Sequence, residues 1–267
     1  MGEGPGTGSS PAACLSGMGE LLEARNLSLR FGGITALEDV SVSIAEGETL
    51  AIIGPNGSGK TSLFNCITGI YRPTAGTIGF RGESLLGRSP DAVTQLGIAR
   101  TFQNLRLFHN MSVVDNLLVG RHLHFKKNFL AAVLRLRGDE IRHRRRCEEI
   151  IEFLNLEPVR KTRVADCPFG LQKRVELGRA LATEPKLLLL DEPVSGLTQE
   201  EKDEISYWIH EIRGRLGITV LLVEHDLRVA SRLASRMVAL DHGVKIAEGT
   251  PTEVQRHPEV IKAYLGE

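Results

Sequence analysis

Residues Gly54–Thr61 read GPNGSGKT, and this stretch decides the fold. It follows the short apolar run GETLAIIG and precedes TSLFNCITGI, in which the spacing of apolar residues is typical of a helix. It satisfies the pattern G-x-x-x-x-G-K-[ST], whose glycines let successive backbone N–H groups curl around phosphate oxygens. The helix N-terminus adds a positive partial charge, Lys60 reaches the terminal phosphates, and Thr61 is a candidate Mg²⁺ ligand.

We therefore predict that a nucleotide binds at this loop. A chance glycine-rich turn is the alternative interpretation, but the strand before the loop and the helix after it favour nucleotide binding. The residues predicted to contact the nucleotide are Gly54, Pro55, Asn56, Gly57, Ser58, Gly59, Lys60, Thr61 and Ser62.

A second stretch, LLLLDE at Leu187–Glu192, ends an apolar run in two acids. Four aliphatic residues in a row predict a fully buried strand, and Asp191 at its carboxyl end can hold the Mg²⁺ shell. Glu192 then stands where a carboxylate could orient or deprotonate an attacking water. An acidic pair after a strand is also common at a plain helix N-terminus, but its occurrence beside a phosphate loop favours catalysis.

Two polar residues follow other predicted strands. Gln103, in ARTFQNLRLF, could ligate Mg²⁺ and sense the γ-phosphate of a nucleotide. His225, in VLLVEHDL, could donate a hydrogen bond to the same phosphate, although a lone histidine is more often structural. We predict catalytic roles for Glu192, His225 and Gln103, and metal ligation by Thr61, Gln103 and Asp191.

The composition excludes several other classes of protein. The 33 Lys and Arg residues balance 33 Asp and Glu residues, so we expect no general attraction to nucleic acid. The four cysteines are scattered and form no C-x-x-C pair, which predicts reduced thiols rather than disulfides or a zinc site. No apolar run approaches the roughly 20 residues that a membrane-spanning helix needs.

The chain divides into a tail and one α/β domain. Residues 1–19 are rich in Gly, Ser, Pro and Ala, which predicts a disordered tail and leaves Met18 as an alternative start to Met1. The stretches Leu21–Phe31, Ser41–Ile44 and GTIGF predict strands, and RMVALDHGVKIAEG predicts a hairpin that turns at Asp241–Gly243.

Strand–helix alternation predicts an α/β core at 20–88 and 158–267, with a helical subdomain at 89–157 between them. The expected fold has a mostly parallel core sheet, an antiparallel β layer and the helical subdomain. The subdomain contains a basic stretch, Arg121–Arg146, which could be a solvated helix face or could contact a membrane surface.

Taken together, these motifs resemble the ATP-binding subunits of ABC transporters, from about Leu21 to the C-terminus. The resemblance implies a P-loop ABC ATPase cassette that binds ATP and Mg²⁺, in which 54–61 is the Walker A loop and 187–192 the Walker B strand. It also implies that Gln103 is the Q-loop residue and His225 the switch histidine. Phe31 lies where the family stacks an aromatic ring on adenine; packing of Phe31 in the core is the alternative.

Three further stretches resemble the ATPases of branched-chain amino acid (LIV-type) importers: FGGITALEDVSVSIAEGE, GIARTFQNLRLF and the C-terminal GTPTEVQRHPEVIKAYLGE. The resemblance implies an energy-coupling ATPase of an importer. Urea and amide importers and the ATPase of lipopolysaccharide export have similar motifs and stay as alternatives. Two other classes are a soluble ABC ATPase outside transport and a regulatory subunit without turnover.

The chain departs from the family pattern in two places. Residues 167–171 read CPFGL where the family has Leu-Ser-Gly-Gly-Gln, so Pro168 replaces the signature serine and only Gly170 is retained. Thr198 stands where the family usually has Asp. We expect the Gly170 N–H to be the group that this loop still offers to a nucleotide on a second subunit. The alternative is that this branch of the family tolerates Pro168 without loss.

The resemblance also implies partners and a location. These are transmembrane permease subunits, a second ATP-binding subunit, and a periplasmic or extracellular solute-binding protein in the assembled system. Because Pro168 would impair both sites of a homodimer, we expect a heterodimer. The implied location is peripheral, at the cytoplasmic face of the inner (plasma) membrane.

Overall fold

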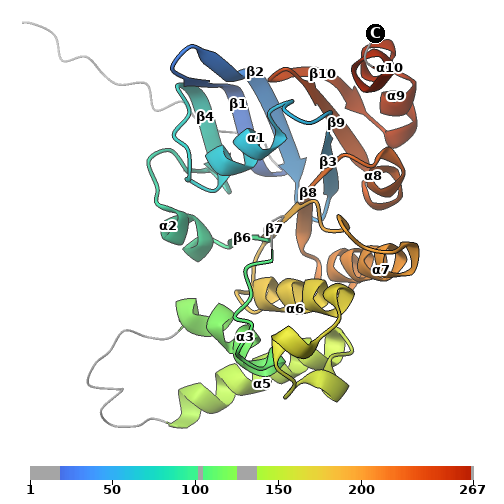
Figure 1. Cartoon of the computed structure of the whole chain (residues 1–267). Coiled ribbons are helices and arrows are strands. Elements are labelled where there is room, and N and C mark those ends of the chain that lie inside the picture. Colours follow the sequence, from blue (N-terminus) through green and yellow to red (C-terminus); the bar gives the residue numbers. More distant parts are fainter. Residues whose placement is uncertain (1–18, 102–104, 125–136, 266–267) are drawn as a thin grey trace, which may run out of the picture.

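The computed structural model describes residues 19–101, 105–124 and 137–265 of the chain. Two β-sheets occupy the upper part of Figure 1, and a group of helices lies below them. The predicted tail lies outside the described residues apart from Gly19, and so does Gln103. Among the described residues, no helix is both long enough and apolar enough to cross a bilayer.

A six-stranded sheet with the order β10-β9-β3-β8-β7-β6 forms the core. Its strands are β3 (Thr49–Ile53), β6 (Ile98–Arg100), β7 (Leu187–Asp191), β8 (Thr219–Glu224), β9 (Arg236–Asp241) and β10 (Val244–Gly249). All neighbours pair in parallel except β9 and β10, which form the predicted hairpin. The prediction of a mostly parallel core sheet is therefore confirmed.

The central strands supply both hydrophobic cores of the molecule. Every residue of β3, β7 and β8 is buried, as expected for parallel strands that are covered on both faces. Leu50 and Ile52 pack with Phe64 of α1 and with the antiparallel sheet, whereas Ala51 and Ile53 pack with the helices on the opposite face. Successive side chains of a strand point to opposite faces, so one sheet stabilises two layers.

A four-stranded antiparallel sheet with the order β2-β1-β4-β5 forms the predicted second layer. Its strands are β1 (Glu20–Phe31), β2 (Ile34–Ala45), β4 (Ala75–Phe80) and β5 (Glu83–Ser84). Strand β2 is longer than the predicted Ser41–Ile44, because its pairing with β1 continues to Phe31 and Ile34. The first residues of β2 are largely exposed and carry no alternating apolar pattern, which explains the shorter prediction.

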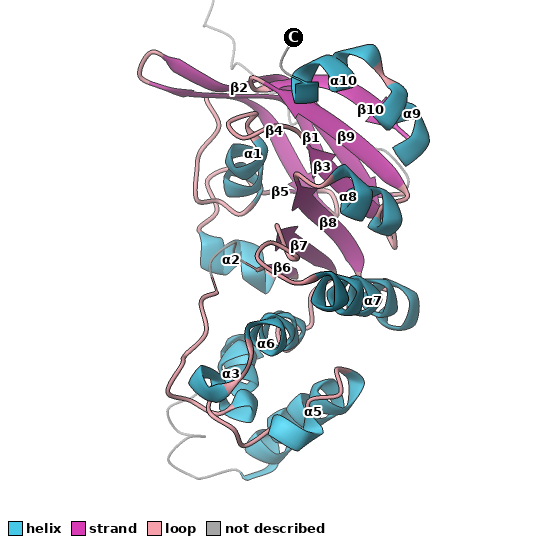
Figure 2. Cartoon of the chain, turned by 45° about the vertical axis from the view of Figure 1, so that its right-hand side comes forward, coloured by secondary structure: helices cyan, strands magenta, loops and turns pink. Residues whose placement is uncertain are grey.

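Helices surround the core sheet and also form a group below it (Figure 1). They are α1 (Lys60–Ile67), α2 (Pro90–Gln95), α3 (Val113–Gly120), α5 (Arg137–Phe153), α6 (Phe169–Leu181), α7 (Gln199–Leu216), α8 (Leu227–Leu233), α9 (Pro251–Arg256) and α10 (Pro258–Leu265). Three short 3₁₀ helices are η1 (Arg121–His124), η2 (Glu157–Val159) and η3 (Val164–Asp166). Figure 2 shows α1 and α2 on one side of the strands and α8 and α9 on the other.

The helices α3, α5 and α6 form a unit below the sheets in Figure 1, and the predicted helical subdomain is the range 89–157. Helix α6 lies outside that range, yet Leu117 of α3, Leu154 and Val175 of α6 share one core cluster. Strand β6 lies inside the range, yet it pairs with β7 in the core sheet. This three-residue strand is the one expected before Gln103.

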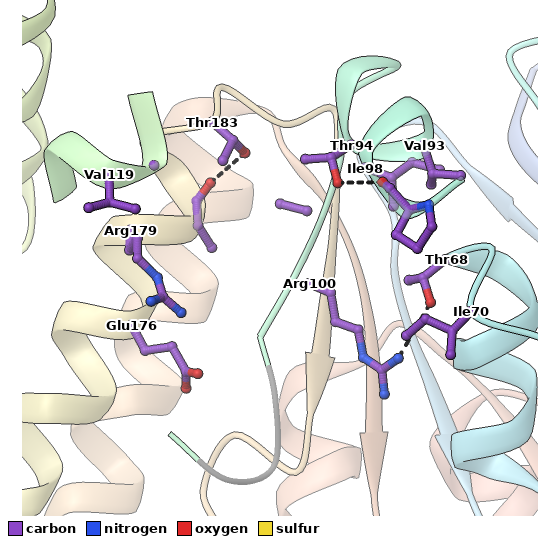
Figure 3. Close-up of a pocket in the computed structure, with 14 residues that line it drawn as sticks. Thr68, Ile70, Val93, Thr94, Ile98, Arg100, Val119, Glu176, Arg179 and Thr183 are labelled. Carbon is purple, nitrogen blue, oxygen red and sulfur yellow. Dashed lines mark hydrogen bonds between the residues drawn. The ribbon is translucent and has the colours of Figure 1, made fainter. Parts of the chain in front are cut away.

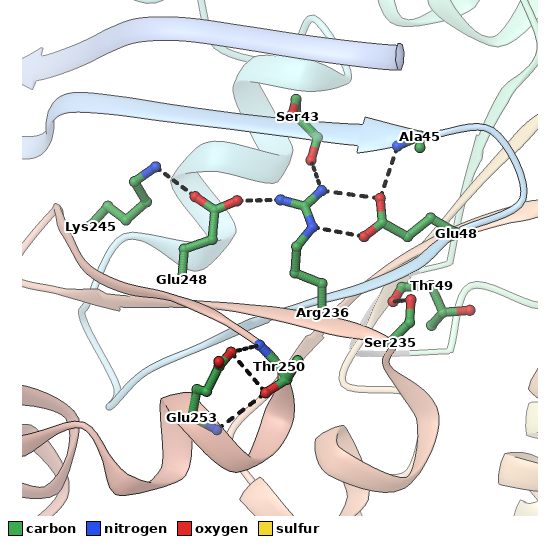
Figure 4. A network of polar contacts seen from close by, with 10 residues as sticks. All are labelled: Ser43, Ala45, Glu48, Thr49, Ser235, Arg236, Lys245, Glu248, Thr250 and Glu253. Carbon is green, nitrogen blue, oxygen red and sulfur yellow. Dashed lines mark hydrogen bonds and ion pairs between the residues drawn. The ribbon is translucent and has the colours of Figure 1, made fainter. Parts of the chain in front are cut away.

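A polar network joins the two sheets (Figure 4). The guanidinium of Arg236, on β9, donates to both carboxylate oxygens of Glu48 at 2.8 and 3.0 Å and to the Ser43 carbonyl of β2 at 2.6 Å. It also pairs with Glu248 of β10. A planar guanidinium suits such a junction because its donors diverge in fixed directions.

Candidate functional site

The predicted phosphate loop connects β3 to α1, with Gly59 as the N-cap of α1. Gly54 and Gly59 both have positive φ, 150° and 100°. A β-carbon at Gly54 would lie 2.1 Å from the Leu240 carbonyl oxygen, and one at Gly59 would lie 2.7 Å from the Ala36 carbonyl oxygen. Only glycine fits either position, so the glycines of the motif are required by close backbone approach.

Lys60 is buried and points back along its own loop. Its ammonium donates to the carbonyl oxygens of Gly54 at 2.7 Å and Pro55 at 2.8 Å. Burial lowers the pKa of Lys60, and the nearby carboxylates of Glu192, Asp191 and Glu224 oppose that shift. The lysine therefore lies close to the acids at the ends of β7 and β8.

The carboxylate of Asp191 is already engaged in an ion pair. Arg100, at the end of β6, donates from Nη2 to Asp191 Oδ2 at 2.6 Å and from Nη1 to Asn65 Oδ1 at 2.7 Å. Both side chains of the ion pair are buried. Arg100 was not predicted, because its partner Asp191 lies 91 positions further along the chain and only the pairing of β6 with β7 brings the two together.

The structure brings Glu192 and His225 together. Glu192 has a φ of 47°, and its Oε2 is 3.6 Å from Nδ1 of His225. The His225 side chain is 52% exposed, whereas that of Glu192 is 12% exposed. This arrangement places an acceptor carboxylate next to an accessible imidazole.

Phe31 stands at the end of β1 and is 46% exposed, so the alternative of core packing is wrong. Its ring makes an edge-to-face contact with Tyr71, with centroids 5.1 Å apart. Gln103 lies outside the described residues, and its predicted role stays a prediction.

The backbone N–H of Gly170, which we expect to face a nucleotide on a second subunit, has a partner within the chain. It is the second residue of α6, whose N-cap is Pro168, and its N–H donates to Glu201 Oε1 at 3.2 Å. The other oxygen of Glu201 accepts from the Thr198 N–H at 2.9 Å, and Thr198 caps α7 in return. The Gly170 N–H is therefore not free in this conformation, because the Glu201 carboxylate bridges the N-termini of α6 and α7.

The oxygen donors present suit Mg²⁺. Thr61 presents an exposed hydroxyl at the start of α1, and Asp191 a carboxylate. Mg²⁺ is usually bound by one or two protein oxygens together with substrate phosphates and water. In the described part of the chain, no cluster of three or more His, Cys, Asp or Glu could form an all-protein metal site.

A buried acid beside the site was not predicted. Glu224, the last residue of β8, is 0% exposed, and burial raises its pKa to about 7. The carboxylates of Glu192 and Asp226 contribute to this raised pKa, while backbone N–H groups of Val194 and His225 oppose the shift. In VLLVEHDL only the apolar run before Glu224 indicated its burial.

The strand–loop–helix at Gly54–Lys60, with the acids at the end of β7, defines a P-loop nucleotide-binding ATPase domain. A family model described as "ABC transporter" matches residues 37–195, and one described as "Branched-chain amino acid ATP-binding cassette transporter" matches residues 244–267. The chain belongs to the ABC transporter family, as an ATP-binding ATPase subunit.

Relatives with the same architecture are known. The high-affinity branched-chain amino acid transport ATP-binding protein BraF of Pseudomonas aeruginosa is 39% identical over 92% of this chain and 98% of its own length. The ADP conformation of MJ1267, an ATP-binding cassette of an ABC transporter, superimposes with a TM-score of 0.83 at 32% identity, over 93% of this chain and 99% of that one. The cassette MJ0796 in a dimeric, post-hydrolysis state with ADP and Pi gives 0.73 at 26% identity, over 86% and 98%.

Replacing Glu224 with Gln should change how stability depends on pH. The folded state holds this proton up to about pH 7, whereas an unfolded glutamate loses it near its ordinary pKa of 4.5. The free energy of unfolding of the wild type should therefore fall between pH 4.5 and 7, by up to roughly 3 kcal/mol. Glu224→Gln should lose that dependence, as measured by urea unfolding at pH 5 and 8.

Glu46→Gln, on an exposed turn, controls for the loss of a carboxyl group. If Glu224→Gln and the wild type showed the same change in unfolding free energy between pH 5 and 8, the assignment of Glu224 as the group with the raised pKa would be wrong.

Proposed function

We propose that this chain is the energy-coupling ATPase of an importer for branched-chain amino acids. The observation that carries the proposal is the match of residues 244–267 to the branched-chain amino acid cassette model, together with a Walker site in which Lys60, Asp191, Glu192 and His225 converge. BraF supports the solute class, since its name specifies branched-chain amino acid transport. Urea, amide or lipopolysaccharide systems remain the alternative.

Hydrolysis in this proposal is direct attack of water on the γ-phosphate. The carboxylate of Glu192 accepts a hydrogen bond from the water and orients it, and His225 donates to the γ-phosphate. Lys60 exchanges its two loop carbonyls for phosphate oxygens. Thr61 and Asp191, with Gln103, would hold Mg²⁺, which supplies charge neutralisation of the phosphates when bound.

The other predicted contacts complete the proposed site. Phe31 would stack on adenine, and its exposure leaves the ring accessible. Pro55, Asn56, Gly57, Ser58 and Ser62 would contribute with the rest of the loop. We further propose that residues 20–88 and 158–267 act as the nucleotide-binding core and 89–157 as the subdomain that transmits nucleotide state, with α6 packed onto it.

Glu192→Gln should cut ATP turnover by at least about 100-fold while the dissociation constant for ATP stays within about twofold, because the amide keeps the shape but cannot accept a proton. It should also favour an ATP-bound closed dimer. Phosphate release and equilibrium ATP binding measure the two effects. Glu200→Gln, an exposed acid at the start of α7, is the matched control. Wild-type turnover in Glu192→Gln would show that another group orients the water.

The permease surface is proposed to be the groove between the core and the helical unit (Figure 3). This cavity of about 250 Å³ has Thr68, Ile70 and Val93 on one wall and Val119 and Arg179 on the other. Arg100 also lines this groove. Because Arg100 donates to the Walker B residue Asp191, an occupant of the groove that contacts Arg100 would be linked to Asp191 through one side chain. Its mixed apolar and polar lining suits a short helix of a membrane protein.

The basic stretch gives less support for membrane contact. Arg144 and Arg145 each pair with a glutamate on the same helix, Glu140 and Glu149, and all four side chains are exposed. Such pairs are typical of a solvated helix face and contribute little to stability. We therefore place the permease contact in the groove and propose a peripheral location at the cytoplasmic face of the inner membrane on that basis.

Val119→Asp should weaken copurification with the permease subunits at least about tenfold, because it places a charge in the apolar wall of the groove. ATP affinity of the purified chain should not change. Leu216→Asp is the matched control: Leu216 is 42% exposed and Val119 36%, both lie on helices, and Leu216 is outside the groove. Equal recovery of the permease with both variants would exclude the groove as the docking site.

The second ATP-binding subunit is proposed to be a different chain with an intact signature serine. The relative MJ0796 forms a dimer with ADP and Pi. Pro168 has neither a hydroxyl nor a backbone N–H to donate. Gly170 would have to exchange Glu201 for the partner's nucleotide, which adds a step that a serine hydroxyl would not need. A solute-binding protein outside the membrane completes the proposed system.

Pro168→Ser should raise the ATPase rate of the chain alone, because a hydrogen bond to a charged group contributes about 1.5–3 kcal/mol, or roughly 10- to 150-fold if fully expressed. With the partner subunit present the rate should change little, because the competent site uses the partner's serine. Pro158→Ser, in η2, controls for proline loss. No gain in the chain alone would mean that the loop works with Pro168.

A further inference from the structure

The C-terminal helix α10 reaches the phosphate loop. The hydroxyl oxygen of Tyr264 accepts a hydrogen bond from the backbone N–H of Gly54 at 2.9 Å, across 210 positions of sequence. Tyr264 is partly buried against the same core cluster as Ile53, the last residue of β3. The contact therefore joins the end of the chain to the first residue of the loop.

Helix α10 is held in place independently of this hydroxyl. Val260 is buried in the core cluster, and its N–H, like that of Ile261, donates to the His257 carbonyl at 3.0 Å. Helix α9 before it is fixed by a capping box between Thr250 and Glu253. Tyr264 therefore lies on a helix that is packed against the rest of the domain.

The Gly54 peptide needs this partner. The pairing of β3 with β8 and β9 ends at Ile53, so the sheet provides no acceptor for the next N–H. Gly54 is buried, and a buried N–H without an acceptor is costly. On its other side the Gly54 carbonyl accepts from Lys60, the side chain that must move to reach phosphate.

We propose that Tyr264 is a positioning residue of the nucleotide site, through which α10 fixes Gly54 while Lys60 exchanges loop carbonyls for phosphate oxygens. The inference rests on the proposed role of this loop in ATP binding. The hydroxyl of Tyr264 is hydrogen-bonded to the Gly54 N–H, so it acts through the loop and not on the substrate. Without its hydroxyl, Gly54 shifts to find another acceptor, and the N–H groups of the loop lose their alignment.

The hydroxyl stays protonated throughout the working range. Burial raises the pKa of Tyr264 to about 12, the nearby carboxylates of Glu224 and Asp226 add to this, and the Gly54 N–H opposes it. The hydrogen bond from Gly54 to Tyr264 should therefore not change with pH between 6 and 9, whereas Glu224 titrates within that range.

The test is Tyr264→Phe, which keeps the ring and removes the oxygen. Its dissociation constant and KM for ATP should rise about 2- to 10-fold, the loss expected for one hydrogen bond, by an equal factor at pH 6 and pH 9, with kcat changed less than twofold. Tyr207→Phe, an exposed tyrosine on α7, is the matched control and should bind ATP as the wild type does. Lys60→Ala should abolish binding and validates the assay.

The outcomes separate the two proposals. A wild-type dissociation constant in Tyr264→Phe, with binding lost in Lys60→Ala, would overturn the role of Tyr264 and leave the ATP site intact. A lowered melting temperature with an unchanged dissociation constant would mean that Tyr264 only packs, and would also overturn it. Absence of ATP binding by the wild-type chain would overturn the proposed function, and this inference with it.

Discussion

The close approach of two neighbouring strands at Gly54 is the constraint on which the site depends. The Leu240 carbonyl of β9 lies where a side chain on residue 54 would begin. The chain can leave β3 there only with a positive φ and no β-carbon, which commits the following residues to a tight turn. That turn aims the start of α1 and Lys60 at the edge where β7 and β8 also end. The packing of the sheet therefore requires glycine at this position, whether or not a phosphate is bound.

The strands stay in the register that brings Leu240 close to Gly54 because the sheet is packed on both faces. Parallel strands with no exposed face cannot slip by one residue, since a slip would exchange the two cores that Leu50 and Ala51 enter. Packing of the two cores therefore sets the strand register. This register places Ile53 opposite Glu224 and Asp191 opposite Val223. The Arg236 junction adds a polar connection to the antiparallel layer at the opposite end of β9.

The parts predictable from the sequence are those in which chemistry and local pattern coincide. The glycine spacing with Lys60, and the apolar run that ends in Asp191 and Glu192, predicted the loop and both acids. Local pattern could not predict partners that only the fold brings together. These partners are hydrogen-bonded pairs: Tyr264 with Gly54, Arg100 with Asp191, and Glu201 with Gly170. The residues of each pair are at least 31 positions apart in the sequence. The Glu201 partner of Gly170 was not predicted for the same reason, because nothing near Gly170 in the sequence indicated that an acid on α7 accepts from its N–H.

The pairing of Arg100 with Asp191 has an electrostatic consequence. A carboxylate buried alone would be costly, so the guanidinium serves as a resident counter-ion before any nucleotide arrives. In the proposed mechanism, a metal–nucleotide complex held by Asp191 would replace this guanidinium, so that one cation would be exchanged for another. The affinity of that complex would depend on the new position of the guanidinium, whose Nη1 already donates to Asn65 Oδ1 at 2.7 Å. The occupancy of the site is thus coupled to the position of an arginine that also lines the groove between the core and the helical unit.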